Sequence, residues 1–367
     1  MTDDWATAFA AVPRAAFLPE VMWPFDLTAQ ASVAVSRAED PAAWLGYAEA
    51  DVPIVTQWDD GRHSGTAPGK VSTSSASMPS VVFAMLGDLE VRPGNAVLEI
   101  GTGTGWNAGL LTHRLGGEKV TTVEVDAAVA AAARESLRRA GLGPTMVTGD
   151  GYGGHLPGAP YDRVIATCGM REIPYAWVEQ TAPGGIVVAP WGTHYGNGDA
   201  VARLVVGDGA ASGRFTRLVE FMKLRAQRRA AVRHGDDVSQ EGTDGADAST
   251  TTVTEAEFLT GRYTAGPFAL GLRVPGCVQA AAEKRGDTRP VWFYGLTDTS
   301  WAVVTFRDGR PASTVHQYGP RRLWDEVEAA FRWWTGRGKP GVERFGLTVD
   351  ADGQYVWLDD PAESWGI

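Results

Sequence analysis

The run from Val97 to Leu111, VLEIGTGTGWNAGLL, joins an apolar stretch to three closely spaced glycines and then to a helical pattern. Gly101, Gly103 and Gly105 allow the backbone to turn tightly and to approach a ligand without an intervening Cβ. The helix that follows them presents unpaired backbone N–H groups to a hydrogen-bond acceptor. This combination indicates a binding site for a nucleotide-containing cofactor.

Three acidic residues narrow the choice of cofactor. Glu99 lies within the apolar stretch, where a carboxylate suits a positively charged group such as the amino group of S-adenosylmethionine. Glu124 closes a second apolar run, about 20 residues further on, where an acid accepts hydrogen bonds from ribose hydroxyls. Asp150 closes a third run and suits the adenine amino group. Each acid alone also fits a solvated strand end, but together they favour a methyltransferase over an NAD-dependent enzyme.

The elements that position these residues alternate between 78 and 230. The pattern predicts helices over 79–90, 106–115, 127–140 and 174–182, and strands over 96–100, 119–125, 145–148, 162–167 and 184–189. Such alternation is typical of a Rossmann-like, doubly wound α/β fold with a mostly parallel sheet, whose ligand lies beyond the carboxyl ends of the strands. The expected cofactor contacts there are Glu99, Ile100, Gly101, Thr102, Gly103, Gly105, Glu124, Val125, Asp150 and Gly151.

Composition divides the 367 residues into four parts. We expect a helical and loop-rich segment over 1–70, a methyltransferase domain over 71–232, a linker over 233–253 and a smaller α+β domain over 254–367. The linker has almost no large apolar side chains, whereas the last part is rich in tryptophan.

Within that last part, 291–296 and 300–306 read as paired strands, 321–335 as a helix and 344–360 as a hairpin around Asp352–Gly353. Its aromatic stripe has the spacing of a core, and part of it also suits a peptide-binding face.

The overall composition excludes several classes of protein. A net charge of −11 argues against a general nucleic-acid binder. No apolar run is long enough to span a membrane and the first residues are acidic, so we expect a cytoplasmic protein without a membrane partner. Cys168 and Cys277 are the only cysteines and the histidines are scattered, so we expect neither a disulfide framework nor a metal site.

Residues 1–230 resemble the protein-L-isoaspartate O-methyltransferase family. The resemblance is carried by VPR at 12–14 with FLP at 17–19, by Ser77–Met78–Pro79 ahead of the glycine run, and by GDGYGGHLPGAPYD at 149–162. FMKL at 221–224 resembles the family's final strand. The resemblance implies S-adenosylmethionine as the cofactor and S-adenosylhomocysteine as its product. Two substrate-side segments, STSSA at 72–76 and CGMR at 168–171, depart from the family pattern.

Methyl transfer to a carboxylate requires orientation but no general base, because the carboxylate is already ionised near neutral pH. Ser77 is the hydroxyl that we expect to orient the acceptor, with Ser75 as second choice; the alternative for Ser77 is a helix N-cap. A basic cluster near the end of the methyltransferase domain fits either substrate binding or a charged helix face; its members are Lys223, Arg225, Arg228, Arg229 and Arg233. The expected substrate contacts are Met78, Pro79, Thr167, Arg225, Arg228 and Arg229.

The chain continues well past the family's usual end. That extension resembles the one on actinobacterial relatives encoded beside ribosomally made peptides, both graspetides and lanthipeptides, which methylate an aspartate of a modified precursor whose ester then closes to an aspartimide. We therefore expect a peptide-tailoring methyltransferase whose partner is a modified, macrocyclised precursor peptide of the graspetide type. The sequence leaves the oligomeric state open, with a monomer favoured. The alternatives are a repair enzyme that methylates isoaspartyl residues of damaged proteins and a non-catalytic peptide-binding module.

Overall fold

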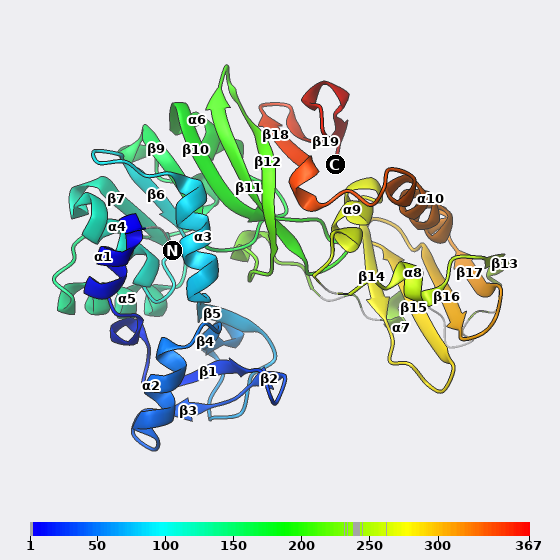
Figure 1. Ribbon diagram of the computed structural model, residues 1–367, viewed down its shortest axis with the longest axis horizontal. Helices are drawn as coiled ribbons and strands as arrows, with labels where there is room; N and C mark the ends of the chain where they lie inside the picture. Colours follow the sequence, from blue (N-terminus) through cyan, green and yellow to red (C-terminus); the bar gives the residue numbers. More distant parts are fainter. Residues whose placement is uncertain (1–2, 231, 233, 238–242, 244, 262) are drawn as a thin grey trace.

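The computed structural model describes residues 3–230, 232, 234–237, 243, 245–261 and 263–367, and builds three sheets from them (Figure 1). The central sheet has ten strands in the order β20-β19-β18-β12-β11-β10-β9-β6-β7-β8. Their bounds are β6 Val97–Ile100, β7 Val120–Glu124, β8 Thr145–Thr148, β9 Tyr161–Ala166, β10 Thr181–Trp191, β11 Asp199–Gly207, β12 Ala210–Val219, β18 Phe345–Asp350, β19 Gly353–Leu358 and β20 Trp365–Gly366.

Half of this sheet is parallel. Strands β8-β7-β6-β9-β10 pair in parallel, and all pairs from β10 outward to β20 are antiparallel. The fold is therefore α/β with a mixed sheet, and the expectation of a mostly parallel sheet was wrong. The antiparallel half begins with the β10–β11 pair and continues through a tight turn at Asp208–Gly209, where both residues have positive φ (51° and 76°). Two such residues favour a two-residue hairpin, which joins β11 to β12 as antiparallel neighbours.

Helices cover both faces of the parallel half, as predicted. Alternate strand residues enter two different cores, since Val97, Ile165 and Val188 pack with one set of helices and their neighbours Leu98, Ala166 and Val187 with another. The helices are α1 Asp3–Ala11, α3 Pro79–Leu89, α4 Trp106–Leu115 and α5 Ala127–Arg139 on the first face, and α6 Tyr175–Glu179 on the second. None of the described helices is long and apolar enough to cross a membrane.

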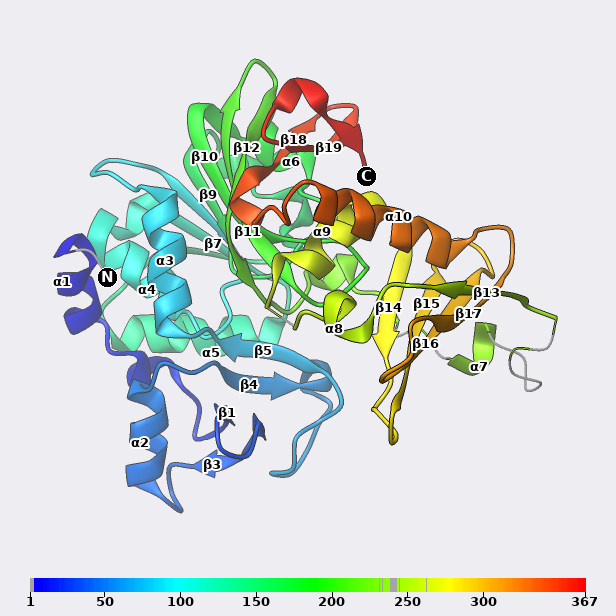
Figure 2. The ribbon, with the colours of Figure 1, turned by 45° about the vertical axis from the view of Figure 1, so that its right-hand side comes forward.

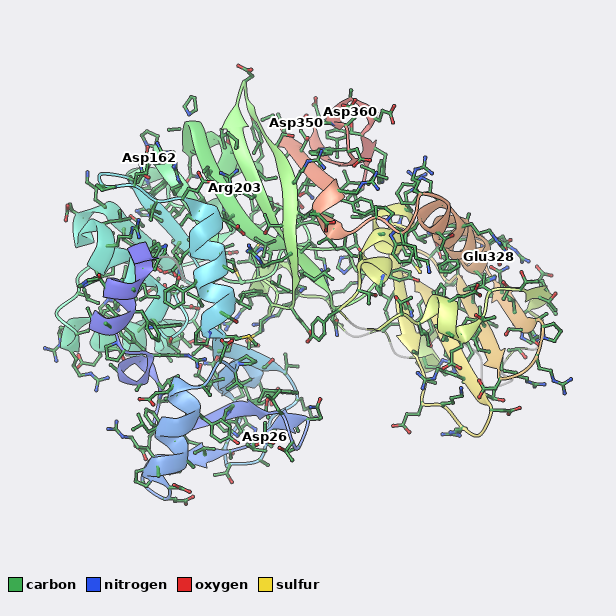
Figure 3. The ribbon with its side chains drawn as sticks, in the orientation of Figure 1. Asp26, Asp162, Arg203, Glu328, Asp350 and Asp360 are labelled. Atoms are coloured by element: carbon green, nitrogen blue, oxygen red, sulfur yellow. The ribbon has the colours of Figure 1, made fainter. Side chains whose placement is uncertain are left out.

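Arg203 on β11 ties α3 to the antiparallel half of the sheet (Figure 3). Its Nε donates to the carbonyl of Asp88 at 3.0 Å, and its Nη2 donates to Glu90 Oε1 at 2.6 Å. Both acceptors lie at the C-terminal end of α3, where cations interact favourably with the helix dipole. The helix that carries Met78 and Pro79 at its start is thus anchored at its other end.

Residues 1–70 differ from the expected helical and loop-rich segment, because they supply most of a second, small antiparallel sheet. The short strands lack a readable alternation of apolar and polar residues, and β5 has the sequence STSSA. The elements are η1 Arg14–Phe17, β1 Val21–Asp26, β2 Ala31–Ser32, β3 Val35–Ser36, α2 Pro41–Glu49, β4 Ile54–Trp58, η2 Asp59–Gly61 and β5 Ser72–Ala76. Strand β5 leads directly into α3 and so connects this sheet to the central one.

The third sheet lies in the C-terminal part, in the order β13-β17-β16-β15-β14. Its elements are η6 Arg225–Gln227, α7 His234–Asp237, β13 Asp247–Thr251, α8 Glu255–Phe258, α9 Ala265–Arg273, β14 Cys277–Ala281, β15 Thr288–Gly295, β16 Trp301–Arg307, β17 Ser313–Tyr318 and α10 Leu323–Gly336. The predicted strand pair is confirmed as β15–β16, and the predicted helix as α10, with its apolar stripe buried. Part of the expected linker forms β13 along the edge of β17, while 231, 233, 238–242 and 244 lie outside the described residues.

The predicted hairpin around Asp352–Gly353 is also confirmed, but it belongs to the central sheet. Strand β18 pairs with β12 along 211–214 and 346–349. Helices α9 and α10 lie between this edge and the third sheet (Figure 2). Phe215 of β12, Phe268 of α9 and Phe293 of β15 belong to one continuous core. The α/β segment up to β12 and the C-terminal part therefore share their hydrophobic interior.

Candidate active site

A cleft of 1030 Å³ lies at the carboxyl ends of β6, β7 and β9. The strand order reverses between β6 and β9, which is where open α/β sheets bind their ligands. Its walls come from β5, the glycine turn, the segment that follows β12, and three residues of the C-terminal part, Tyr263, Val278 and Leu296. The cleft thus adjoins all three sheets.

The glycine turn has the backbone geometry that the sequence indicated. Gly101, Gly103 and Gly105 have φ values of 93°, 54° and 89°, which L side chains rarely adopt. A Cβ on Gly101 would lie 3.0 Å from Thr167 Oγ1, and one on Gly103 would lie 3.4 Å from the carbonyl oxygen of Ser75. Gly101 and Gly103 line the cleft, whereas Gly105 packs against α5 and is not among the lining residues. The turn therefore provides a narrow cradle that only glycines fit.

Glu124 lies at the end of β7 and faces the cleft. Its Oε2 accepts from the Gly103 N–H at 2.9 Å and its Oε1 from the Asp126 N–H at 3.0 Å. An ionised carboxylate offers about four lone-pair sites, so it retains acceptor capacity for ribose hydroxyls. This geometry suits the nucleotide-containing cofactor that the glycine turn predicts.

Glu99 is fully buried and is not among the residues that line the cleft. Its carboxylate accepts from Asn107 Nδ2 at 2.6 Å and from Thr122 Oγ1 at 2.5 Å, and the Thr122 hydroxyl lies 2.6 Å from that of Thr102 in the turn. The structure therefore places Glu99 beneath the turn rather than beside a ligand's amino group. Burial raises the pKa of Glu99 to about 7, although both hydrogen bonds act in the opposite direction.

Glu99→Gln is expected to change how stability depends on pH. The folded chain keeps the Glu99 proton up to about pH 7, whereas the unfolded chain loses it near 4.5, so this stabilisation is complete below 4.5 and is lost as pH rises to 7. The change amounts to about 3 kcal/mol. Urea unfolding at about pH 5 and pH 8 should show the wild type losing about 2.5 kcal/mol of this stabilisation relative to the variant. A constant difference would contradict the role of this proton.

The remaining predicted cofactor residues divide between the cleft and its surroundings. Ile100, Thr102, Val125 and Gly151 line the cleft. Asp150 is exposed, and its Oδ1 accepts from the Tyr152 N–H at 3.0 Å, outside the set of lining residues. Asp150 therefore lies at the strand end but does not face the cleft.

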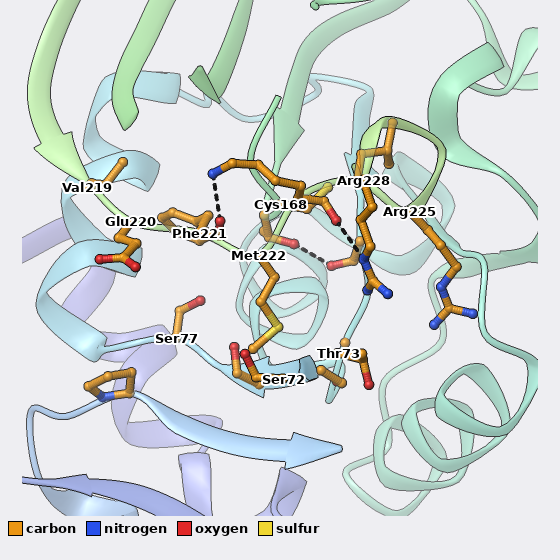
Figure 4. A pocket seen from close by; sticks show the side chains of 18 of the residues that line it. Ser72, Thr73, Ser77, Cys168, Val219, Glu220, Phe221, Met222, Arg225 and Arg228 are labelled. Atoms are coloured by element: carbon orange, nitrogen blue, oxygen red, sulfur yellow. Dashed lines mark hydrogen bonds between the residues drawn. The ribbon is translucent and has the colours of Figure 1, made fainter. Parts of the chain in front are cut away.

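Ser77 and Ser75 both line the cleft, and Figure 4 shows Ser77 on the side opposite Arg225. Within the described part of the chain, the Ser77 hydroxyl has no hydrogen-bond partner, and α3 has no side-chain cap at Met78. Asp51 accepts from the Ser80 N–H at 2.8 Å and serves this helix start instead. The Ser77 hydroxyl is therefore available to a ligand.

Arg14 is a supporting residue that the sequence marked only through the VPR motif. Its buried guanidinium donates to the carbonyls of Ala76 and Ser77, at 2.9 and 3.0 Å, and to Val52 at 2.9 Å. It also lies over the ring of Trp106, at 5.7 Å from the centroid. Burial lowers the pKa of Arg14 to about 10, so it stays charged at neutral pH. Arg14 thus holds the backbone of Ser77 against the start of α4.

Thr167 and Cys168 close the cleft behind the glycine turn. Thr167 Oγ1 donates to the carbonyl of Gly101, so this hydroxyl supports the turn. Burial raises the pKa of the Cys168 thiol to about 12, and the nearby Glu124 adds to the effect. The thiol therefore remains protonated and does not act as a nucleophile.

The basic cluster does not form a helix face, and FMKL at 221–224 does not form a strand beyond an isolated bridge at Lys223. The cluster follows β12 along the cleft. Arg228 donates to Asp60 at 2.7 Å, and Arg225 lies 3.2 Å from both Asp60 and Asp126. These ion pairs join the N-terminal sheet to the central sheet. Asp60 could not be recognised from the sequence, because most of the segment from 71 to 232 separates it from its arginine partners.

The predicted substrate contacts divide between the cleft and its surroundings. Met78, Thr167 and the three arginines Arg225, Arg228 and Arg229 line the cleft, whereas Pro79 forms the first turn of α3 and does not. Arg171 also lines the cleft; the sequence marked it only as part of the substrate-side segment CGMR. His194 lines the cleft as well, and no local pattern around it indicated a ligand site.

Comparison with known proteins gives a family for part of the chain. Residues 62–227 match the sequence model of the family described as Protein-L-isoaspartate(D-aspartate) O-methyltransferase (PCMT). The Protein-L-isoaspartate O-methyltransferase of Methanoculleus marisnigri is 44% identical over 117 residues, which cover 32% of this chain and 52% of that protein. That of Pyrococcus horikoshii is 40% identical over 120 residues, covering 32% and 54%. The chain spans about half the length of the curated relatives it matches.

A solved structure of a protein-L-isoaspartate O-methyltransferase resembles the whole fold. It aligns with 98% of this chain and 96% of its own chain at a TM-score of 0.54, with 22% sequence identity. At that identity the likeness concerns the fold, and it extends beyond the segment that the family covers.

Proposed function

We propose, from the premise that residues 62–227 form an S-adenosylmethionine-dependent O-methyltransferase domain of the protein-L-isoaspartate type, that this chain methylates an aspartate of a ribosomally made peptide. The substrate we propose is a modified, macrocyclised precursor of the graspetide type, whose methyl ester then closes to an aspartimide. The supporting observation is the cleft, which joins the glycine turn and Ser77 to Tyr263, Val278 and Leu296 of the C-terminal part.

Methyl transfer requires little of the protein beyond positioning the methyl donor and the carboxylate. When bound, S-adenosylmethionine supplies a methyl group on a positively charged sulfonium. An aspartate oxygen, ionised near neutral pH, forms the bond to the methyl carbon while the C–S bond breaks, so the products are a methyl ester and a neutral thioether. The following backbone nitrogen then attacks the ester carbonyl, loses its proton and expels methanol. Orientation of the carboxylate is the main contribution that the protein has to make.

Each cleft residue has a role in this scheme. Glu124 would accept from the ribose hydroxyls, and the glycine turn would admit the cofactor close to the backbone of β6. Ser77 would donate one hydrogen bond to the acceptor carboxylate, because its hydroxyl faces the cleft without a partner among the described residues. Met78 and the arginines that follow β12 would contact the rest of the peptide.

Selectivity favours tailoring as the biological role. A tailoring enzyme must choose one ordinary aspartate among many, and a methyl-transfer site alone provides little basis for that choice. Binding energy from remote parts of a substrate can place its reacting group. Because the C-terminal part contributes directly to the cleft wall, it can make such remote contacts.

The second candidate is repair of isoaspartyl residues in damaged proteins. The curated relatives carry the name of that activity, and the family model of the same description matches residues 62–227, which include the glycine turn and most of the cleft. A repair enzyme must accept damaged sites in many sequences, so it gains little from remote contacts to one peptide.

Mass spectrometry separates the two candidates. Incubated with enzyme and S-adenosylmethionine, a macrocyclised precursor should gain one methyl group, then lose methanol and end one water lighter than it began. Hydrolysis of that product should return both aspartate and isoaspartate, because either carbonyl of the ring can be attacked.

A simple isoaspartyl peptide and the linear precursor serve as comparisons in the same assay. Methylation of the isoaspartyl peptide without any reaction of the precursor would assign the repair activity instead. If no peptide is methylated although S-adenosylhomocysteine still binds, the non-catalytic peptide-binding module is the remaining alternative.

A further inference from the structure

The cleft is positively charged within an acidic chain. Among the described residues that line it, six are Lys or Arg and two are Asp or Glu, whereas the whole chain has a net charge of −11. A cleft of one sign with low-dielectric walls concentrates its field on a ligand of the opposite sign. The positive residues are Lys70, Arg171, Lys223, Arg225, Arg228 and Arg229.

Most of these cations are already neutralised by carboxylates of the fold. Asp199 is fully buried and accepts from Arg171 at 2.9 Å and from Lys223. Asp60 forms ion pairs with Arg225 and Arg228, and Asp126 forms an ion pair with Arg225. Three carboxylates thus face four cations, and each of the four is held by a structural contact.

Arg229 is held differently. Its Nη2 donates to the carbonyl of Leu296, a neutral acceptor in the loop after β15, and it forms no ion pair within the described residues. The contact spans from the central sheet to the third sheet, so it fixes the side chain at the wall between them. A guanidinium has five N–H donors, which leaves most of them for a ligand.

His194 lines the same wall, in the loop after β10. Its pKa is lowered first by burial and then by the charges of Arg171, Arg229 and Lys223. Arg171 and Lys223 share the carboxylate of Asp199, which balances both of these cations. Arg229 contributes to this wall a positive charge that no ion pair among the described residues neutralises.

We propose that Arg229, in the cleft that His194 also lines, is a second carboxylate-binding subsite, so that the substrate class is a peptide with an acidic side chain in addition to its acceptor aspartate. This inference rests on the proposed function. The planar guanidinium matches a carboxylate through two parallel hydrogen bonds, which makes an acidic side chain a suitable partner. Long nucleic acids are disfavoured because the net charge outside the cleft repels them. Holding the second carboxylate would orient the peptide across the cleft toward Ser77.

The test uses the full chain with S-adenosylhomocysteine present and fluorescein-labelled synthetic peptides. Each peptide has one acceptor aspartate and, at a neighbouring position, Asp, Asn or phosphoserine. Binding is measured by fluorescence polarisation. At one or more positions, the Asp peptide should bind roughly tenfold more tightly than the Asn peptide, as expected for one charge-assisted contact. Arg229→Gln should remove that preference.

Arg332→Gln is the matched control, since Arg332 is an exposed arginine of α10 that pairs with Glu328 and lies outside the cleft. It should retain the preference in full. Equal affinities for Asp and Asn peptides in the wild type, or a preference that survives Arg229→Gln, would overturn the inference. A preference for phosphoserine over Asp that requires Arg229 would replace the carboxylate by a phosphate.

Failure of the inference and failure of the proposed function are distinguishable, because the first is measured by binding and the second by methyl transfer. A preference for Asp that depends on Arg229, without methyl transfer to any peptide, supports the subsite and removes the proposed activity. Methyl transfer without such a preference supports the activity and removes the subsite.

Discussion

Ser77→Ala is expected to slow methyl transfer by about 10- to 1000-fold and to leave the affinity for S-adenosylmethionine nearly unchanged. The hydroxyl faces the cleft without a partner among the described residues, so its loss removes an orienting hydrogen bond but no contact of the fold. The rate is measured with a methyl-accepting peptide at saturating cofactor, and the affinity by calorimetric titration. The result should be a lower kcat with intact cofactor binding.

Asp51→Ala provides the contrast for this prediction. Asp51, rather than Ser77, accepts from the Ser80 N–H at the start of α3, so its removal should cost about 0.5–2 kcal/mol of stability. Ser77→Ala should leave thermal unfolding unchanged by comparison. Loss of folding or of cofactor binding in the Ser77 variant would show that the serine supports the helix start and does not act on the substrate.

Leu347→Ala is expected to destabilise the whole chain by about 2–5 kcal/mol. Leu347 lies in β18, is fully buried and belongs to the core shared by the central and third sheets. Because the two sheets share that core, urea unfolding should remain a single transition whether it is followed through the methyltransferase half or the C-terminal part.

Leu27→Ala is the matched control, because the Leu27 side chain is 69% exposed. It should change the free energy of unfolding by no more than about 0.5 kcal/mol. A Leu347 variant that loses only the C-terminal part, while the methyltransferase half unfolds as in the wild type, would show that the two parts are energetically separate.

The parallel half of the fold was predictable because each of its elements has a local signature. Helix α4 follows a glycine turn, and α5 begins at Asp126, whose side chain accepts from two N–H groups of its first turn. The antiparallel half depends on pairings between distant segments, such as β12 with β18. Apolar periodicity indicates that a strand exists but does not identify the sheet it joins, so the hairpin at 352–353 was recognised while its place in the central sheet was not.

The candidate site also contains residues that the sequence could identify and residues that it could not. The glycine turn and Glu124 were recognisable from residue type and spacing, and the structure brings both to the cleft. The hydrogen-bond partners of Glu99 could not be recognised from the sequence. Asn107 and Thr122 lie on other elements, and their hydrogen bonds to Glu99 form only when these elements pack together. Asp60 and Asp199 escaped for the same reason, since a carboxylate that neutralises a distant arginine has no local pattern.

The pairing of β12 with β18 also has a consequence for synthesis of the chain. During translation, β12 emerges long before β18, which begins only at Phe345, so the central sheet waits with an open edge while the third sheet is made. The same pairing implies that a protease cut between β12 and β13 would leave two fragments joined by a ladder of backbone hydrogen bonds and a common core. Such a nicked protein should migrate as one particle until it is denatured.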